Sequence, residues 1–414
     1  MSIPSCEVLV LGAGVIGSSV AMHLAEKGLN SVLVVDLDLE GTWSSSELNA
    51  GGVRATWTQP LNIEISKTSI EYFAKVKDSV GYHPCGYLWL HSEKRWSNAL
   101  KASELQREMG WEVEQWDIPK LRDKRPFIDK TDDLVGALFA PKDGLVNPNL
   151  LKTHFREKAR AKSVQFFDCI WIDGFEKSGK RIKALGKKIK SDPEYQNDDF
   201  RKTVLVDGRL PEGSYEPISI LTDRIVNCTG AWAPEISKKL NSECPSKPYR
   251  RQISIFDCRD VDLRPYGMIV DPSGVYFHPE ATNGLAGYAD PAEPSARNFD
   301  YDGEGFFMEK IWMALYERST SFEKLKHLSG WGGLYEVSPD ESGIIGEALC
   351  EDRELQGRVF EAHSFSGHGA MQSYSVGRGI AEKMVNGRYE TIDLEPLDVS
   401  RFSKGKLISE NLVI

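Results

Sequence analysis

The chain has 414 residues, of which 41% are hydrophobic and 27% charged, and this is the balance of a folded globular protein rather than a disordered or fibrous one. Its 51 Lys and Arg residues are outnumbered by 61 Asp and Glu residues, which gives a net charge of −10 and argues against a nucleic-acid binder. The length predicts two domains, or one domain with a large insertion.

Cysteine content and targeting signals add further expectations. The 7 cysteines include no CxxC pair and predict reduced, packed thiols, and we expect no metal site. The uncharged stretch 8–25 is interrupted by glycines, so we expect no transmembrane segment. Neither a secretory signal nor an Arg-rich presequence is visible at the start. These features predict a cytoplasmic protein, with the mitochondrial matrix as the alternative location.

The first predicted elements form a βαβ unit. Residues 7–11 (EVLVL) are a short apolar run bounded by glycine, which indicates a buried strand. Helical spacing follows as far as Gly28, and residues 32–35 are a second buried strand that ends at Asp36. The first strand therefore leads through a glycine-rich turn directly into a helix.

That turn carries the sequence GAGVIG, with Val15 and Ile16 before its last glycine. In a dinucleotide fingerprint the first glycine permits a tight turn, the second lets the backbone approach a pyrophosphate, and the third lets helix and strand pack closely. Gly12, Gly14 and Gly17 match these positions, and Asp36 can accept both hydroxyls of an adenosine ribose. The unit predicts dinucleotide binding but does not distinguish NAD from FAD.

The remaining elements alternate between helix and strand patterns. Helices are expected over about 61–80, 95–109 and 149–161, and a buried strand over 164–172. Residues 176–223 are rich in Lys, Asp, Pro and Gly and predict exposed hairpins or an insertion. The spacing then predicts a strand at 225–227, strands of a different sheet at 251–256, 274–278 and 285–288, and a helix over 371–386.

Three glycine-containing segments decide the cofactor: SSSELNAGGVR at 44–54, IVNCTGAWA at 225–233 and FSGHGAM at 365–371. Together with the βαβ unit they resemble the D-amino-acid oxidase and sarcosine oxidase superfamily of FAD enzymes, over nearly the whole chain. The resemblance implies that the ADP half of FAD is held by Gly12, Gly14, Val15, Ile16, Gly17 and Asp36, with Ser45 near the pyrophosphate. It implies that Gly51 and Gly52 pass beside the flavin ring and that a turn beneath the ring is formed by Gly230, Ala231 and Trp232. It also implies that backbone donors reach the N1 and O2 edge of the ring from Gly367, His368, Gly369 and Met371.

The sequence also departs from relatives in this superfamily. Some attach FAD covalently through a His in the loop that here reads LNAGG, or through a Cys where this chain has Gly333, so we expect noncovalent FAD. Sarcosine-type oxidases use a Lys over the flavin near the segment that here reads NGLAGY (283–288), and a second Lys where this chain has Met371. The absence of both lysines favours a dehydrogenase that passes electrons to an acceptor other than oxygen, which the sequence does not identify.

Five residues are candidates for contact with the substrate. Arg54 can pair bidentately with a carboxylate, the alternative being a structural salt bridge. Tyr276 and His278 alternate on a strand and so share one face, although a buried His is often purely structural. Trp331 and Tyr335 flank a glycine pair, and core packing is the alternative for both.

The sequence thus predicts an α/β protein in which a Rossmann-type FAD-binding domain (1–85, 145–245 and 326–414) is interleaved with a mixed-sheet substrate domain (86–144 and 246–325). The expected reaction is oxidation of the C–N bond of an amino acid or N-methyl amino acid by hydride transfer to flavin N5. The expected partners are a small carboxylate-bearing amine and an electron acceptor. The alternative is a flavin-loaded assembly or scaffold factor of the respiratory complex I type, with little turnover.

Overall fold

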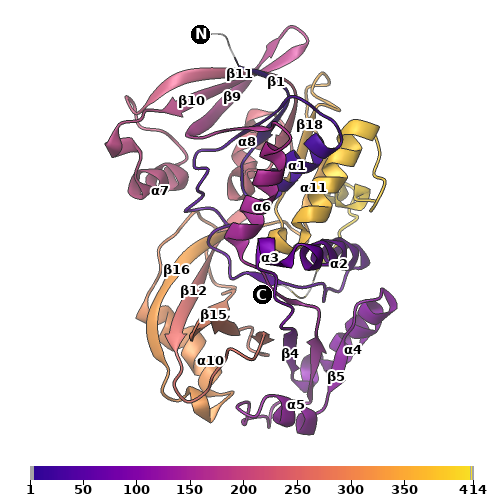
Figure 1. Cartoon of the computed structure of the whole chain (residues 1–414), viewed down its shortest axis with the longest axis vertical. Helices are drawn as coiled ribbons and strands as arrows, with labels where there is room; N and C mark the ends of the chain where they lie inside the picture. The colour runs from indigo at the N-terminus through magenta and orange to yellow at the C-terminus, as the bar shows by residue number, and fades with distance from the viewer. Residues whose placement is uncertain (1–3, 411, 413–414) are drawn as a thin grey trace.

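The computed structural model describes residues 4–410 and 412 and contains two bodies, each built on an eight-stranded sheet (Figure 1). The upper sheet has the order β17-β18-β11-β1-β2-β8, and β10 and β9 extend it beyond β11. Its strands are β1 (Ser5–Leu11), β2 (Val32–Val35), β8 (Gln165–Phe167), β9 (Ile170–Ser178), β10 (Arg181–Ile189), β11 (Tyr215–Asn227), β17 (Ile344–Glu347) and β18 (Val359–His363).

Strand β1 lies at the centre of the upper sheet. It pairs in parallel with β2 on one side and with β11 on the other, and β18 and β8 continue the parallel pairing outward. Val8, Leu9 and Val10 are all fully buried, because helices cover both faces of the sheet. This explains why β1 is a continuous apolar run rather than an alternating one.

Helices cover the two faces of the upper sheet. Val8 and Val10 pack in one cluster with α1 (Val15–Glu26), α6 (Pro148–Arg160) and α11 (Gly369–Asn386), which lie in front of the sheet in Figure 1. Leu9 and Leu11 point to the opposite face and share a cluster with Ile236 of α8 (Ala233–Lys239). Helices α2 (Pro60–Lys75), α3 (Lys77–Val80), α7 (Asp198–Asp207) and α12 (Ser400–Ser403) complete the described α-helices of this body.

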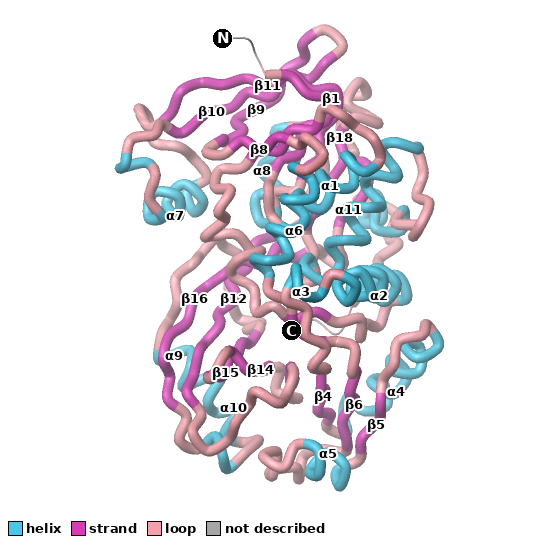
Figure 2. Tube along the Cα trace, viewed as in Figure 1, coloured by secondary structure: helices cyan, strands magenta, loops and turns pink. Residues whose placement is uncertain are grey.

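The lower sheet has the order β16-β12-β15-β14-β13-β4-β6-β5 and is mostly antiparallel. Helices α4, α5, α9 and α10 pack around it (Figure 2). Its elements are β4 (Tyr87–His91), α4 (Glu93–Glu108), β5 (Glu114–Trp116), α5 (Ile118–Lys124), β6 (Gly136–Ala140), β12 (Lys247–Asp257), β13 (Met268–Val270), β14 (Tyr276–Glu280), β15 (Asn283–Tyr288), α9 (Glu304–Phe306), α10 (Met313–Tyr316) and β16 (Lys326–Val337).

The α/β fold with two interleaved sheets is confirmed, and the chain crosses between the bodies several times. At one crossing, β3 (Gly52–Val53) pairs with β7 (Gly144–Leu145) in a two-stranded ribbon. One segment differs from expectation: we expected residues 326–337 in the FAD domain, but β16 pairs with β12 along its length and so belongs to the lower sheet. The glycines in β16 obscured its strand pattern in the sequence.

Two other segments differ from the sequence-based expectation. The single strand expected over 164–172 is divided into β8 and β9, because the chain turns at Cys169, whose φ is 61°. Residues 176–223 do not form only exposed hairpins, since β10 and β11 extend the upper sheet and α7 packs on a small core through Val204. The Asn197 side chain caps α7 by accepting a hydrogen bond from the Phe200 amide at 2.8 Å.

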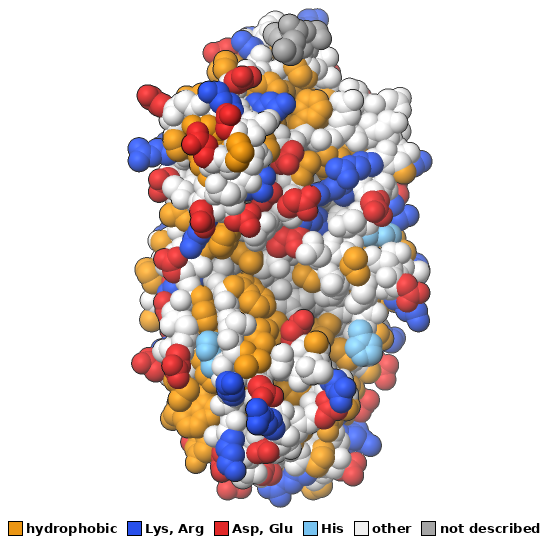
Figure 3. All heavy atoms as spheres, turned by 60° about the vertical axis from the view of Figure 1, so that its left-hand side comes forward, with side chains coloured by type: hydrophobic (Ala, Val, Ile, Leu, Met, Phe, Trp, Pro, Cys, Tyr) orange, Lys and Arg blue, Asp and Glu red, His pale blue; other side chains and the backbone are white. Residues whose placement is uncertain are grey.

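The surface carries charges of both signs. Figure 3 shows Lys, Arg, Asp and Glu side chains spread over the molecule, with more apolar side chains over its lower part. Within residues 4–410, no helix combines the length and the apolar character that a bilayer crossing requires.

A buried ion pair fixes the segment that follows α11. Arg401 in α12 makes two hydrogen bonds of 2.8 Å to the carboxylate of Asp340, and the side chains are 3% and 0% exposed. Asp340 also accepts a hydrogen bond from the Ile408 amide at 2.9 Å. These contacts hold the pKa of Asp340 below its usual value and connect the loop after β16 to the C-terminal region.

Replacing Asp340 with Asn is expected to lower the free energy of unfolding by about 3 to 5 kcal/mol, because it leaves the buried Arg401 without an anion. Since the pKa of Asp340 is lower in the folded state, its contribution is present above about pH 4 and is lost as the pH falls through the folded-state pKa. Urea unfolding from pH 7 to pH 3 measures both effects. The pair of Asp257 with the exposed Arg259 provides the control, since Asp257→Asn should change stability by less than about 1 kcal/mol.

Candidate functional site

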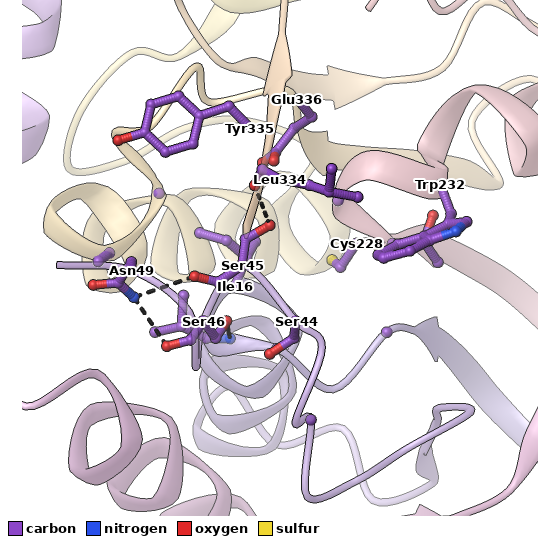
Figure 4. Close-up of a pocket in the computed structure, with 18 of the residues that line it drawn as sticks. Ile16, Ser44, Ser45, Ser46, Asn49, Cys228, Trp232, Leu334, Tyr335 and Glu336 are labelled. Carbon is purple, nitrogen blue, oxygen red and sulfur yellow. Dashed lines mark hydrogen bonds between the residues drawn. The ribbon is translucent and has the colours of Figure 1, made fainter. Parts of the chain in front are cut away.

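A pocket lies where the carboxyl ends of β1, β2 and β11 face the lower sheet. Crevices at this edge of a parallel sheet are the usual ligand sites of doubly wound folds. Figure 4 shows part of the wall, with the Ser44–Asn49 loop facing Leu334 and Glu336. Of the residues that the sequence indicated, the wall contains Gly12, Gly14, Val15, Ile16, Asp36, Ser45, Gly51, Gly52, Arg54, Gly230, Trp232, Tyr276, Tyr335, Gly367, His368, Gly369 and Met371.

The glycine turn after β1 is packed too closely for side chains. Gly12 has a φ of 93°, and a Cβ atom there would lie 2.5 Å from the carbonyl oxygen of Cys228. A Cβ atom on Gly17 would lie 1.9 Å from the carbonyl oxygen of Gly12. Gly17 therefore acts beneath the pocket, where it lets α1 approach the turn, while Gly12 and Gly14 line the pocket itself.

The N-terminus of α1 opens into this pocket. Gly14 occupies the N-cap position and has no side chain to cap the helix, and the Val15 amide donates to Ser46 Oγ at 2.9 Å. Free amides and the positive end of the helix dipole favour an anion at this point. The geometry fits a pyrophosphate, as the glycine spacing predicts.

Asp36 lies at the end of β2, in the pocket wall. Its carboxylate accepts hydrogen bonds from the amides of Ala13 and Asp38. Burial raises the pKa of Asp36, and these two amides oppose that rise. The carboxylate thus connects β2 to the glycine turn and has capacity left to accept from a ribose hydroxyl.

The serine loop divides its contacts between the two bodies. We expected Ser45 near the pyrophosphate, but its hydroxyl donates to the Leu334 carbonyl at 2.7 Å, and the next residue, Ser46, reaches the start of α1. The sequence alone does not determine which residue in the run of three serines at 44–46 contacts the start of α1. Farther along, the Gly51 amide donates to Asn49 Oδ1 at 2.7 Å, which shapes the turn that we expect beside the flavin ring.

Arg54 is a buried cation, and only 2% of its surface is exposed. Its guanidinium lies 3.4 Å from the ring centre of Trp57 and donates to the carbonyls of Thr56 and Leu412. Burial lowers its pKa to about 10, so it is charged at neutral pH. Within residues 4–410 and 412 its guanidinium donates to carbonyl oxygens rather than to a carboxylate, although Asp143 and Glu410 are near enough to favour its charged form.

Asp143, which the sequence did not indicate, organises the backbone after Arg54. It accepts hydrogen bonds from the Ala55 amide and Trp111 Nε1, both at 2.9 Å, and from Thr56 Oγ1 at 3.0 Å. Complete burial raises its pKa to about 7. It occurs in a turn (DGLVNP), and only the tertiary contact with residues 55–56 shows its role.

The four other substrate-contact candidates separate into two pairs. Tyr276 and Tyr335 line the pocket, and burial raises the pKa of both hydroxyls, so they are neutral donors. His278 and Trp331 are not in the wall. The ring nitrogens of His278 lie 2.8 and 2.9 Å from the carbonyls of Pro279 and Ala50, and Trp331 Nε1 donates to the Leu48 carbonyl at 2.8 Å. These two residues hold the 48–50 loop against the lower sheet, and this structural role is the one that their contacts support.

The remaining glycine turns come to the same pocket. Gly230 and Trp232 line it, whereas Ala231 is 2% exposed and packs behind the wall with Phe299 and Leu334. Trp232 Nε1 donates to the Leu205 carbonyl at 2.9 Å, which directs the indole along the wall.

His368 precedes the first turn of α11 and faces the pocket. Its ring centre is 3.9 Å from that of Trp57, and within the described chain neither ring nitrogen has a hydrogen-bond partner. Burial holds the pKa of His368 well below its usual value, so the ring is neutral. The buried Met371 lies in the wall within the first turn of the same helix, next to the free amides at the helix start.

Replacing Asp36 with Ala is expected to weaken binding of the FAD predicted from sequence by about 1.5 to 3 kcal/mol, because the ribose loses a charged acceptor and the Ala13 amide loses its partner. Flavin fluorescence released on dilution of the yellow protein measures the change. Asp36→Asn is the matched control, since it keeps one acceptor, and its FAD affinity should lie between those of the wild type and Asp36→Ala. Equal retention of flavin by all three proteins would show that Asp36 has no part in binding.

Comparison with known proteins agrees with this geometry. A family profile described as FAD dependent oxidoreductase matches residues 7–383. The chain is 28% identical to FAD-dependent oxidoreductase domain-containing protein 1 of Xenopus laevis, over 98% of this chain and 85% of that protein. It is 22% identical to monomeric sarcosine oxidase of Bacillus sp. (strain NS-129), over 96% of each. The structure of L-proline dehydrogenase from P. horikoshii matches with a TM-score of 0.81 at 22% identity, covering 98% of this chain and 100% of the other, and shows the same fold.

The profile therefore covers both bodies and all four glycine-containing segments, and it confirms the resemblance inferred from those segments. It also decides between the two dinucleotides that the βαβ unit alone left open. The chain belongs to the FAD dependent oxidoreductase family, and its cofactor is FAD.

Proposed function

We propose that this protein oxidises the C–N bond of a small amino acid or N-methyl amino acid and passes the electrons to an acceptor other than oxygen. The observation that carries the proposal is Arg54, a buried cation without a carboxylate partner among the described residues, in the wall that also holds Gly51 and Gly52. A planar guanidinium in a dehydrated pocket favours a carboxylate. Relatives named as sarcosine oxidase and L-proline dehydrogenase support the same substrate class.

Each residue of the substrate side has a defined task in this proposal. Arg54 binds the carboxylate and so fixes which C–N bond faces the cofactor. Tyr276 and Tyr335 offer neutral hydroxyls to the substrate, and Trp57, Tyr87 and Met268 exclude water. Bound FAD supplies the two-electron oxidation.

The choice of a dehydrogenase rests on two positions. The 283–288 segment forms β15 of the lower sheet and contains no lysine, and Met371 occupies the wall where sarcosine-type oxidases have a lysine. A cation near the flavin helps oxygen to accept an electron, and its absence from these positions supports a different acceptor. The FAD is held without a covalent bond in this proposal, because Asn49 and Gly333 offer no attachment chemistry.

The alternative, a flavin-loaded scaffold with little turnover, has weaker support. Exposed apolar side chains such as Met308, Met313 and Leu328 occur on the lower body, where a partner could dock. The convergence of Arg54, Tyr276 and Tyr335 on one buried pocket is what an enzyme requires and what a docking surface does not. We therefore favour catalysis.

The proposal is tested by anaerobic mixing of the yellow protein with a panel of N-methyl, cyclic and primary amino acids. We expect flavin absorbance near 450 nm to bleach with at least one of them, and the reduced protein to reoxidise faster with an artificial quinone than with air. Intact FAD should be released by acid precipitation. A fully flavin-loaded protein that no amine reduces would support the scaffold alternative.

Arg54→Ala is expected to raise the activation free energy of flavin reduction by about 2 to 5 kcal/mol, because the substrate carboxylate loses its partner. Arg54→Lys should also be impaired, since lysine keeps the charge but loses the planar fork. The exposed Arg259 provides a matched control, and Arg259→Ala should reduce flavin at the wild-type rate. FAD content and melting temperature are measured for each variant. Wild-type reduction by a fully loaded Arg54→Ala protein would show that Arg54 is structural.

A further inference from the structure

Glu336 is a buried acid that the substrate side of the site does not use. It lies near the end of β16, is 8% exposed and lines the pocket (Figure 4). Two flavin-side loops meet β16 here. Ser45 donates to the Leu334 carbonyl at 2.7 Å, and the Ser366 amide donates to the Glu336 carbonyl at 3.0 Å. The carboxyl group is therefore placed on the cofactor side of the wall.

The surroundings of Glu336 contain no cation that pairs with it in the described part of the chain. Burial raises the pKa of its carboxyl, and the backbone amides of Glu336 and Phe365 oppose that rise. Tyr335 on the same strand and His368 on the adjoining loop are both neutral, and β12 places Pro248 opposite it. Arg54, beyond Tyr335, donates its hydrogen bonds elsewhere. Burial raises the pKa of Glu336 to about 7, so the group ionises near neutrality.

Because FAD is an anion, we expect its binding to depend strongly on whether the Glu336 carboxyl is protonated. The pyrophosphate of FAD brings negative charge to the same pocket, at the start of α1 beside Ser46. A second, uncompensated negative charge in a buried wall disfavours its approach. A protonated carboxyl removes this repulsion and adds a hydrogen-bond donor that can face the cofactor.

We propose that Glu336 holds FAD as a neutral carboxylic acid, so that binding of FAD takes up a proton. The proposal concerns the cofactor and is independent of which substrate the enzyme oxidises. It makes Glu336 a positioning residue whose ionisation loosens the cofactor. FAD affinity should consequently be constant below about pH 7 and should fall above it, by up to about tenfold for each pH unit.

The test is equilibrium release of FAD from the holoprotein on dilution, followed by flavin fluorescence between pH 6 and 8.5. The wild type should show the fall in affinity, and Glu336→Gln, which cannot ionise, should show a flat profile. Glu341→Gln is the matched control. Burial also raises the pKa of Glu341, but this residue is only partly buried and lies outside the pocket wall, so its variant should keep the wild-type slope.

Calorimetric titration of the reconstitutable apoprotein with FAD, in buffers of different ionisation enthalpy, counts the protons directly. Near pH 7.5 we expect uptake approaching one proton for the wild type and for Glu341→Gln, and close to none for Glu336→Gln. The wild-type measurement can overturn the proposal even if Glu336→Gln does not fold. A wild type without proton uptake would overturn the proposal, and so would a slope that persists in Glu336→Gln and disappears in Asp36→Asn, because the proton would then belong to Asp36.

Discussion

The site depends on close contact between two backbone turns. The carbonyl oxygen of Cys228 lies where a side chain at Gly12 would be, and the carbonyl of Gly12 lies where a side chain at Gly17 would be. This contact brings the ends of β1 and β11 and the start of α1 to one point. Any larger residue would separate them, and the free amides of α1 would no longer face the pocket.

Burial of charge is the second organising feature. Arg54, Asp143 and Glu336 are all removed from water, and each lacks a side-chain ion-pair partner among the described residues. Asp143 is satisfied by neutral donors, and Arg54 by carbonyls and the face of Trp57. Unpaired buried charges are costly, and of these three residues Arg54 and Glu336 line the pocket. We infer that substrate and cofactor complete these interactions.

The two bodies contribute different residues to the pocket. The upper sheet supplies the glycine turns and Asp36, and the lower sheet supplies Tyr276, Tyr335 and Glu336. Residues that do not touch the pocket maintain the junction: His278 and Trp331 bind carbonyls of the 48–50 loop, and Arg401 binds Asp340 beyond the end of β16. The substrate side is thus built on strands, whose positions are more precise than those of free loops.

Local patterns in the sequence were sufficient to predict that the chain binds a dinucleotide. The GAGVIG turn and Asp36 are adjacent in one βαβ unit, and short-range geometry alone dictates how they meet a dinucleotide. Resemblance of three further glycine-containing segments extended this to FAD. Ser46 rather than Ser45 contacts the start of α1, and a one-residue difference within a run of serines is decided by the partner of Ser45, Leu334, which lies 289 residues away in the chain.

The substrate half was decided by tertiary structure. Arg54 was identified from its position after Gly51 and Gly52, but its burial and its contact with Trp57 follow from packing between distant segments. Asp143 and Glu336 gave no signal, since a carboxylate in a turn or strand is ordinarily exposed. His278 and Trp331 looked equivalent to Tyr276 and Tyr335 in sequence. Only the pairing of β12 with β16 and the course of the 48–50 loop determine which of the four side chains reach the pocket, because these are long-range contacts that no local pattern encodes.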